Sequence, residues 1–150
     1  MPGYGISAAA SGMLSWEWAV ERLAASHDYW LATTWADGRP HVMPVWGVWE
    51  DAGLWFSSSL QARKARNLAR DPRCVLTTDN PREPVVLEGI AELVRDIQAI
   101  GRFAAWTNAK YGTDYAPEFF EENGCYRVRP TWVFALDSSR FAESPTRWVF

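Results

Sequence analysis

The sequence predicts a mainly β protein with flanking helices, in which about six short antiparallel strands form a closed or nearly closed barrel. Short runs rich in aromatic and β-branched residues recur along the chain, and turn signals such as Asp37-Gly38 separate them. Short strands joined by hairpin turns favour closure into a barrel. The predicted helices are too few, and wrongly placed, for a doubly wound parallel sheet.

The first half of the chain is predicted to form a helix, a three-strand meander and a second helix. Ser15 is a suitable N-cap and Glu17 lies in the first turn, and apolar residues then recur at helical spacing up to His27. Aromatic and β-branched runs predict strands at residues 29–35, 40–50 and 54–59, with "ADGR" and "EDAG" as the turns between them. A helix of residues 61–70 follows.

The second half returns to strands around two further helices. "CVLTTD" and "VVLEGIAELV" predict strands at residues 74–79 and 85–94. Residues 96–110 and the short segment "PEFFEEN" are predicted to be helical. "CYRVRPTWVFALD", residues 125–137, is a strand with a bulge or break at Pro130, and "TRWVF" ends the chain.

Length and composition indicate one globular domain at residues 15–150, after a Gly-, Ala- and Ser-rich segment, residues 1–14, that we expect to be a flexible tail. The chain has 150 residues, of which 48% are hydrophobic and 22% charged. Its net charge of −3 argues against a nucleic-acid binder, which is normally basic. The start of the chain has no basic region and no long apolar run, so neither a signal peptide nor a membrane partner is expected.

Cysteine usage predicts a reduced, cytoplasmic protein. Cys74 and Cys125 are the two cysteines, and they are far apart in the sequence without metal-ligand spacing. The chain has two His residues and no close Cys/His cluster, so no metal site is predicted.

The strand of residues 40–50 has two apolar faces. One face carries Val42, Pro44, Trp46 and Val48, and the other carries Met43, Val45 and Trp49. One face would line the barrel interior, so the other must be covered by a partner subunit, a ligand or both. Pro44 cannot donate a ladder hydrogen bond and Gly47 has no side chain. This segment is therefore either a place where a flat molecule approaches the backbone or an edge-strand bulge.

The helix of residues 61–70 begins with a cluster of positive charge. Arg63 and Lys64 fall in its first turn, with Arg66 close behind, although a helix start disfavours cations by roughly 0.3–1 kcal/mol each. A bound phosphate or carboxylate would reverse that cost and would also accept from free N–H groups there. The preceding residues Ser57, Ser58 and Ser59 can add hydroxyl donors. We predict a small-anion site here, the alternative being a solvated basic face.

A helical wheel divides this helix into a buried and an outer side. The buried side consists of small and apolar residues, Ala62, Ala65, Leu68 and Ala69. Arg63 and Asn67 are predicted to lie opposite, and Lys64 borders the buried side.

No nucleophile or acid–base pair can be assigned from a motif. The chain has no GxGxxG, P-loop, GxSxG or HExxH pattern. An acidic cluster, Asp114, Glu118, Glu121 and Glu122, is predicted to be solvated surface. The catalytic residues are therefore unknown, and a cofactor would carry the chemistry of an enzyme of this kind.

Residues 37–79, "DGRPHVMPVWGVWEDAGLWFSSSLQARKARNLARDPRCVLTTD", resemble a known family. The order of strand, turn, strand, "RK", helix, "NL", "DPR" and strand resembles the pyridoxamine 5′-phosphate oxidase-like, FMN-binding split β-barrels of the flavin/deazaflavin oxidoreductase superfamily. The segments "MPVWGVW", "RKARNL" and "SPTRWVF" look most like the branch that uses the deazaflavin coenzyme F420.

The resemblance implies a homodimeric split β-barrel with the cofactor bound in grooves at the subunit interface. It implies that Arg63 and Lys64 hold the cofactor phosphate, with Asn67 nearby. The strand-end positions that contact the cofactor match Ser57 and Ser58. The strand along the cofactor ring matches Met43, Pro44, Val45 and Trp46. A C-terminal pair that reaches the site in some relatives matches Arg147 and Trp148.

The expected function is that of a coenzyme F420-dependent reductase, which transfers hydride from the reduced deazaflavin to a conjugated small organic substrate. The flavin-oxidase branch usually has a basic residue where Met43 stands and polar or aromatic groups at Ser57, which argues against pyridoxamine oxidation. Trp30, Trp46 and Trp106 are expected to shape the substrate side, and solvent to supply the proton. The alternatives are an FMN-dependent oxidoreductase on the same fold, a non-catalytic flavin- or deazaflavin-binding protein, and an interaction domain with a vestigial groove.

Overall fold

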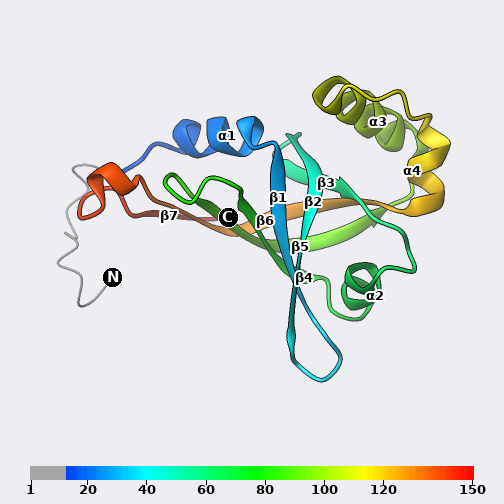
Figure 1. Ribbon diagram of the computed structural model, residues 1–150, viewed down its shortest axis with the longest axis horizontal. Helices are drawn as coiled ribbons and strands as arrows, with labels where there is room; N and C mark the ends of the chain where they lie inside the picture. The colour runs from blue at the N-terminus through cyan, green and yellow to red at the C-terminus, as the bar shows by residue number, and fades with distance from the viewer. Residues whose placement is uncertain (1–12) are drawn as a thin grey trace.

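Six antiparallel strands close into a barrel in the computed structural model, which describes residues 13–150 (Figure 1). The strands are β1 (Asp28–Thr34), β2 (Pro40–Glu50), β3 (Gly53–Ser57), β4 (Arg73–Thr78), β5 (Val85–Val94) and β6 (Cys125–Ala135). Their order is β3-β2-β1-β4-β5-β6, and β3 pairs back onto the first half of β6. A short strand, β7 (Thr146–Val149), pairs with the second half of β6. The predicted mainly β barrel is confirmed.

Helix α1 (Trp16–Ala25) packs against the barrel core. The Ser15 hydroxyl caps it by accepting from the Trp18 N–H, as its sequence predicts. Ala19 and Leu23 are buried with the side chains that fill the barrel. Leu14, the last residue of the predicted tail, is also buried, and its N–H donates to the Thr146 hydroxyl at 2.8 Å. Met13 is exposed, and residues 1–12 of that tail lie outside the described residues.

Two helices, which lie beyond the C-terminal end of α1 in Figure 1, cover part of the barrel exterior. They are α3 (Ile97–Tyr111) and α4 (Pro117–Asn123). Phe103 of α3 and Phe120 of α4 form a second apolar cluster with Val48 and Trp55, which project outward from β2 and β3. Helix α2 (Arg63–Arg70) follows β3, and a single 3-10 turn (Ser138–Arg140) precedes β7. None of the helices within residues 13–150 is long and apolar enough to cross a membrane.

The predicted irregularity at Pro130 is present as a shift in the β5–β6 register. Glu88 pairs with Trp132, whereas Gly89 pairs with Pro130, so Thr131 is an extra residue on β6. A Cβ atom on Gly89 would lie 2.4 Å from the Arg129 carbonyl oxygen. Glycine is therefore required where the two strands approach most closely.

The outer face of β2 changes character along the strand. Near its end, Val48 is buried under α3, but Val42 and Trp46 are exposed. Strand pairing continues this outer face across the sheet, in a row formed by Pro44, Trp30, Thr77, Val86, Phe134 and Arg147. We call this row and its neighbours the open sheet face. It carries large exposed side chains such as Trp30, which is 48% exposed.

Candidate functional site

Helix α2 begins without a side-chain cap. Its N-cap residue is Ala62, and its first turn contains no acidic residue. The Arg63 guanidinium lies over the Trp35 ring, 3.9 Å from the ring centroid. At the other end, Arg70 donates to the Thr34 and Trp35 carbonyl oxygens at 2.7 and 2.8 Å. The β1–β2 hairpin thus holds α2 while the N–H groups of its first turn stay uncapped.

Asn67 and Ala69 lie on opposite sides of α2 as predicted, but the assignment of Ala69 to the buried side and Asn67 to the outer side is wrong. Asn67 is 3% exposed and Ala69 is exposed. The Asn67 side-chain amide donates to the Thr33 hydroxyl at 3.0 Å. Because β1 presents this polar partner beneath the helix, an amide can be buried there without losing its hydrogen bond. Asn67 therefore ties α2 to β1, and its contact with a cofactor stays a prediction.

Lys64 differs from these neighbours because its ammonium group is uncommitted. Within residues 13–150, no carboxylate lies at ion-pair distance from it, and it makes no hydrogen bond to another side chain. Its side chain lines a pocket. A cation next to an uncapped helix start is unfavourable on its own, and an anion would stabilise both.

The pocket beside Lys64 has a volume of about 320 Å³, within the size range of small-molecule sites. It brings together six of the residues predicted from sequence: Pro44, Val45, Trp46, Ser57, Ser58 and Lys64. The rest of its wall comes from the loop before α2, from the helices α3 and α4 and from the loop between them, and consists of Ser59, Phe103, Thr107, Tyr115, Phe119, Phe120 and Asn123. The arrangement combines one cation with five aromatic side chains, those of Trp46, Phe103, Tyr115, Phe119 and Phe120.

The serine segment at the end of β3 is fixed by Gly124. The Ser57 hydroxyl and the Ser58 N–H both donate to the Gly124 carbonyl oxygen, at 3.1 and 3.2 Å. Ser59 accepts from the Gln61 N–H at 3.2 Å and so shapes the turn into α2. The Ser58 bond to Gly124 lies at the next position of the β3–β6 register, and the turn at Ser59 then leads the chain away from the sheet into α2.

The end of α3 is clamped onto β2 beside the pocket. The Lys110 ammonium donates to the Ser26 and Gly47 carbonyl oxygens at 2.6 and 2.7 Å. The Tyr111 hydroxyl accepts from the Gly47 N–H at 2.8 Å. The Tyr111 ring stacks on Trp46 with centroids 4.3 Å apart and planes 4° apart. This clamp sets the position of one pocket wall.

Burial perturbs both titratable groups of the clamp. Desolvation lowers the pKa of Lys110 to about 8, against the opposing attraction of Asp28 and Asp79. Desolvation also raises the pKa of Tyr111 to about 12, so its hydroxyl keeps its proton at neutral pH. The clamp is therefore held by hydrogen bonds whose donor protons are present at pH 7.

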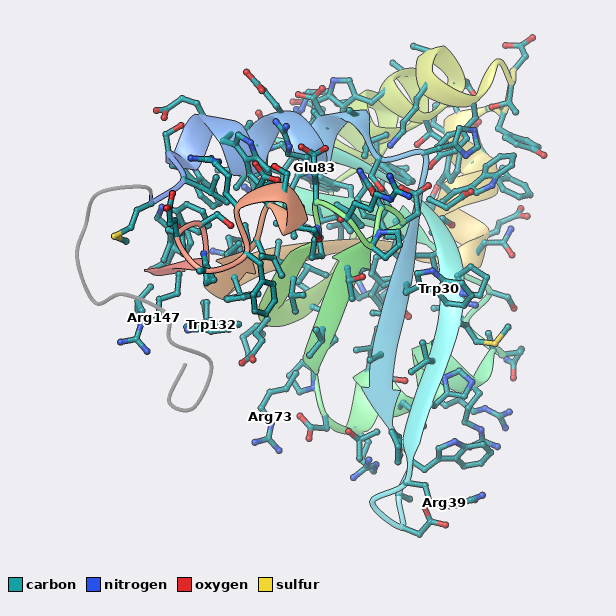
Figure 2. All side chains as sticks on the ribbon, turned by 60° about the vertical axis from the view of Figure 1, so that its left-hand side comes forward. Trp30, Arg39, Arg73, Glu83, Trp132 and Arg147 are labelled. Atoms are coloured by element: carbon teal, nitrogen blue, oxygen red, sulfur yellow. The ribbon has the colours of Figure 1, made fainter. Side chains whose placement is uncertain are left out.

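Besides Asn67, four predicted site residues lie outside the pocket in a single chain. Met43 is 44% exposed and Arg63 is stacked on Trp35. Arg147 lies at the other end of the open sheet face from Trp30, next to Trp132 (Figure 2). Trp148 packs against Trp16 with ring centroids 5.3 Å apart. The chain alone does not bring its C-terminal pair to Lys64.

The three tryptophans expected near a substrate occupy three different environments. Trp46 lines the pocket. Trp30 lies on the open sheet face. Trp106 packs edge-on against Trp55, with centroids 5.7 Å apart, and lines a different hollow. The predicted acidic surface is confirmed, because Asp114, Glu118, Glu121 and Glu122 are all exposed.

The model of the family described as "pyridoxamine 5′-phosphate oxidase" matches residues 16–137, which contain the barrel and the pocket. This chain belongs to the pyridoxamine 5′-phosphate oxidase family. The resemblance of residues 37–79 to these proteins is thereby confirmed. No curated protein sequence matches the chain significantly.

Solved structures share this family fold. A conserved hypothetical protein from Mycobacterium tuberculosis is 23% identical, with a TM-score of 0.77 over 87% of this chain and 89% of that one. A protein described as an F420 reductase is 27% identical, with a TM-score of 0.62 over 75% of this chain and 93% of that one. A heme storage protein from Vibrio cholerae is 23% identical, with a TM-score of 0.60 over 76% and 85% of the two chains.

The sequence did not predict the part of the pocket wall that α3, α4 and the loop between them supply. Phe103 and Thr107 are four residues apart on α3 and so share one face of that helix. Tyr115 and Phe119 stack with centroids 4.5 Å apart. The helical spacing of Phe103 and Thr107 was visible in the sequence, but nothing local in the sequence says which strand this face covers.

Proposed function

We propose that this protein is a coenzyme F420-dependent reductase that delivers hydride from the reduced deazaflavin to a conjugated small organic substrate. The observation that carries the proposal is the uncommitted Lys64 ammonium at the uncapped start of α2, opening on an aromatic-walled pocket. The 27% identity to an F420 reductase supports the deazaflavin over other cofactors.

The residues present fit a phosphorylated flat cofactor. Lys64 and the first-turn N–H groups of α2 would bind its phosphate, and Arg63 would add charge from its position on Trp35. Pro44, Val45 and Trp46 would support the ring, and Pro44 has no backbone N–H that a covering ring would leave unpaired. The backbone of Gly47 is not open to such a ring, because its N–H and carbonyl are bonded to Tyr111 and Lys110. Ser57 and Ser58 would border the phosphate side.

When bound, the reduced deazaflavin supplies the hydride. The chain itself would bind, orient and shield the reactants, which is the usual contribution of a protein to cofactor chemistry. The aromatic side chains of Phe103, Phe119 and Phe120 would exclude water from the ring. We assign no general acid, and solvent is the proposed source of the proton.

We further propose that two copies pack through the open sheet face to form a homodimer. Trp30, Val42 and Trp46 are each close to half exposed on this face, a larger apolar exposure than a monomer normally leaves. Arg147 lies in the same row of paired positions as Pro44, at the opposite edge. A two-fold arrangement of this face would therefore carry Arg147 toward the partner's pocket, whereas Trp148 packs inward against Trp16.

Two other functions share the phosphate handle. An FMN-dependent oxidoreductase would use the same Lys64 contact, because FMN also ends in a phosphate. A non-catalytic flavin- or deazaflavin-binding protein would need the pocket but no reaction. The protein is proposed to act in the cytoplasm, without nucleic-acid or membrane partners.

A fluorescence titration of the purified protein with oxidised F420 and with FMN tests the proposal. Tight binding of F420 alone supports it, and binding of FMN alone would refute the choice of cofactor. Reduced F420 should then be consumed when a panel of enones and quinones is added. Binding without any turnover would favour the non-catalytic function.

The Lys64→Ala variant tests the anion site separately. Loss of a charge-assisted hydrogen bond of about 1.5–3 kcal/mol predicts an affinity for F420 lowered roughly 10- to 150-fold. Arg66→Ala is the matched control, because Arg66 is exposed and lies outside the pocket. It removes the same charge from the same helix and should change affinity by less than about threefold. Equal losses in both variants would indicate a diffuse electrostatic effect and would contradict the Lys64 assignment.

A further inference from the structure

One polar atom of the pocket wall has no hydrogen-bond partner. Thr107 is 4% exposed, and its hydroxyl is one of three buried side-chain nitrogen or oxygen atoms without a partner in the described part of the chain. The other two are the Nε atoms of Arg22 and Arg127, whose terminal guanidinium nitrogens do make hydrogen bonds. Of these three residues, Thr107 is therefore the one whose side chain forms no hydrogen bond at all.

The hydroxyl lacks even the bond that a helix normally offers. A threonine inside a helix commonly donates to the carbonyl oxygen four residues earlier, which for Thr107 belongs to Phe103. That bond is not formed here. Buried polar groups are almost always paired, and an unpaired one calls for a specific explanation.

The surroundings of Thr107 indicate what its partner is. Thr107 and Phe103 line the pocket from the same face of α3, and residues 44–46 of β2 line another part of its wall. Phe119 and Phe120 supply further aromatic wall. The nearby Lys110 ammonium is occupied by carbonyl oxygens, so Lys64 is the cation available in this pocket. The anionic group of a ligand would bind at Lys64. The ligand atom that pairs with the Thr107 hydroxyl would therefore be a neutral polar atom.

We propose that Thr107 is a ligand-binding residue of this pocket, whose hydroxyl hydrogen-bonds a carbonyl oxygen or ring N–H of a planar ring that carries an anionic group to Lys64. The proposal rests on the proposed function in taking the ring to be that of the cofactor. It adds a specificity contact from α3, a helix that supplied none of the residues predicted to bind the cofactor.

The test compares Thr107→Val, which keeps the shape but removes the hydroxyl, with Thr107→Ser, which keeps the hydroxyl. Both are titrated with oxidised F420, FMN and pyridoxal 5′-phosphate, the last being a smaller phosphorylated ring that is independent of the proposed function. Thr107→Val should lower the affinity for the probe that binds by about tenfold, the scale of one hydrogen bond, whereas Thr107→Ser should stay within about threefold of the wild type.

Thermal unfolding of the ligand-free variants gives a second readout. Because the hydroxyl has no partner within the chain, Thr107→Val should unfold at the same temperature as the wild type or higher. Thr113→Val is the matched control, since the Thr113 hydroxyl donates to Asn108 at 2.8 Å just beyond the same helix. It should lower the unfolding temperature and leave ligand affinity unchanged.

The outcomes separate the two proposals. If F420 binds equally to the wild type and to Thr107→Val, the Thr107 proposal is overturned and the proposed function stands. If neither F420 nor FMN binds but pyridoxal 5′-phosphate binding is weakened by Thr107→Val, the function fails and the Thr107 contact stands. Binding of none of the three probes, or a marked loss of stability in ligand-free Thr107→Val, overturns the Thr107 proposal.

Discussion

Replacing Lys110 by methionine should loosen the wall of the pocket. The Lys110 ammonium joins three elements, because it donates to the Ser26 carbonyl after α1, to the Gly47 carbonyl of β2 and to the Tyr29 hydroxyl of β1. Methionine can replace the apolar stem of the lysine but not its three donors. The Gly47 carbonyl would keep the Tyr111 hydroxyl, 3.0 Å away, as a shared donor, because the same hydroxyl proton also points to the His27 carbonyl at 2.5 Å.

The loss of stability in Lys110→Met comes mainly from the Ser26 carbonyl, which loses its side-chain donor. An unsatisfied buried acceptor costs about 1–3 kcal/mol, and the half-exposed position of Lys110 favours the lower part of that range. We expect Lys110→Met to lower the free energy of unfolding by about 1–2 kcal/mol at pH 7. Urea denaturation of the wild type and variant measures this difference.

The pH dependence gives this prediction its sharpest test. The folded protein releases the Lys110 proton near pH 8, whereas an unfolded lysine holds it to about pH 10.5. Between these values the unfolded state binds more protons, so the contribution of Lys110 to stability rises with pH. The stability gap between wild type and Lys110→Met should therefore widen from pH 8 to pH 9.5. Unfolded tyrosines begin to ionise in this range, but they are the same in both proteins and so cancel in the gap.

The charged and titratable groups facing Lys110 do not reverse this sign. Asp28 and Asp79 favour its charged form, but burial outweighs them. The pKa values of Tyr29 and Tyr111 are raised by burial, so both stay protonated in the folded state over this range. Lys110→Arg is the control, because a guanidinium keeps its charge and should show no such widening. A gap that is constant or narrows toward pH 9.5 would refute the reasoning.

Two further predictions concern packing and thiol chemistry. Gly89→Ala should lower the free energy of unfolding by about 1–3 kcal/mol or more, because the added methyl group would overpack against Arg129. Gly101→Ala should raise it by about 0.5–1 kcal/mol, because Gly101 lies on α3 with open space around it. Urea denaturation of both variants measures these changes. Burial raises the pKa of the Cys74 and Cys125 thiols to about 12, so neither should react with a disulfide reagent at pH 8 until the chain unfolds. A thiol that reacts rapidly in the native protein would contradict this burial.

The strands could be predicted closely because their signals are local. Alternating apolar residues and turn residues placed strands at residues 40–50 and 85–94, and the structure has β2 and β5 at Pro40–Glu50 and Val85–Val94. The end of β3 was less accurate, since a strand was predicted through residue 59. It ends at Ser57, one position before the Ser58 bond to Gly124, and Ser59 already belongs to the turn into α2.

The candidate site was predictable only where the sequence broke a local rule. Lys64 stood out because a cation at a helix start is unfavourable unless something binds there. Asn67 was misplaced because its burial depends on the Thr33 hydroxyl beneath α2, a tertiary contact. Thr107 gave no signal at all, since its interest lies in a hydrogen bond that the folded chain fails to supply.

The distribution of the predicted residues bears on how the site is completed. Six of them meet in one pocket formed with β2, β3 and α2, while Arg147 lies at the other edge of the open sheet face. Strand pairing fixes that separation within a chain, because β3 and β7 pair with opposite ends of β6: Ser57 is opposite Cys125, whereas Arg147 is opposite Phe134. A flexible loop could close such a gap, but Arg147 is paired in β7 and cannot swing across the barrel. If Arg147 contributes to binding, it must therefore act on a second copy, and a monomeric protein would have to bind its cofactor without the C-terminal pair.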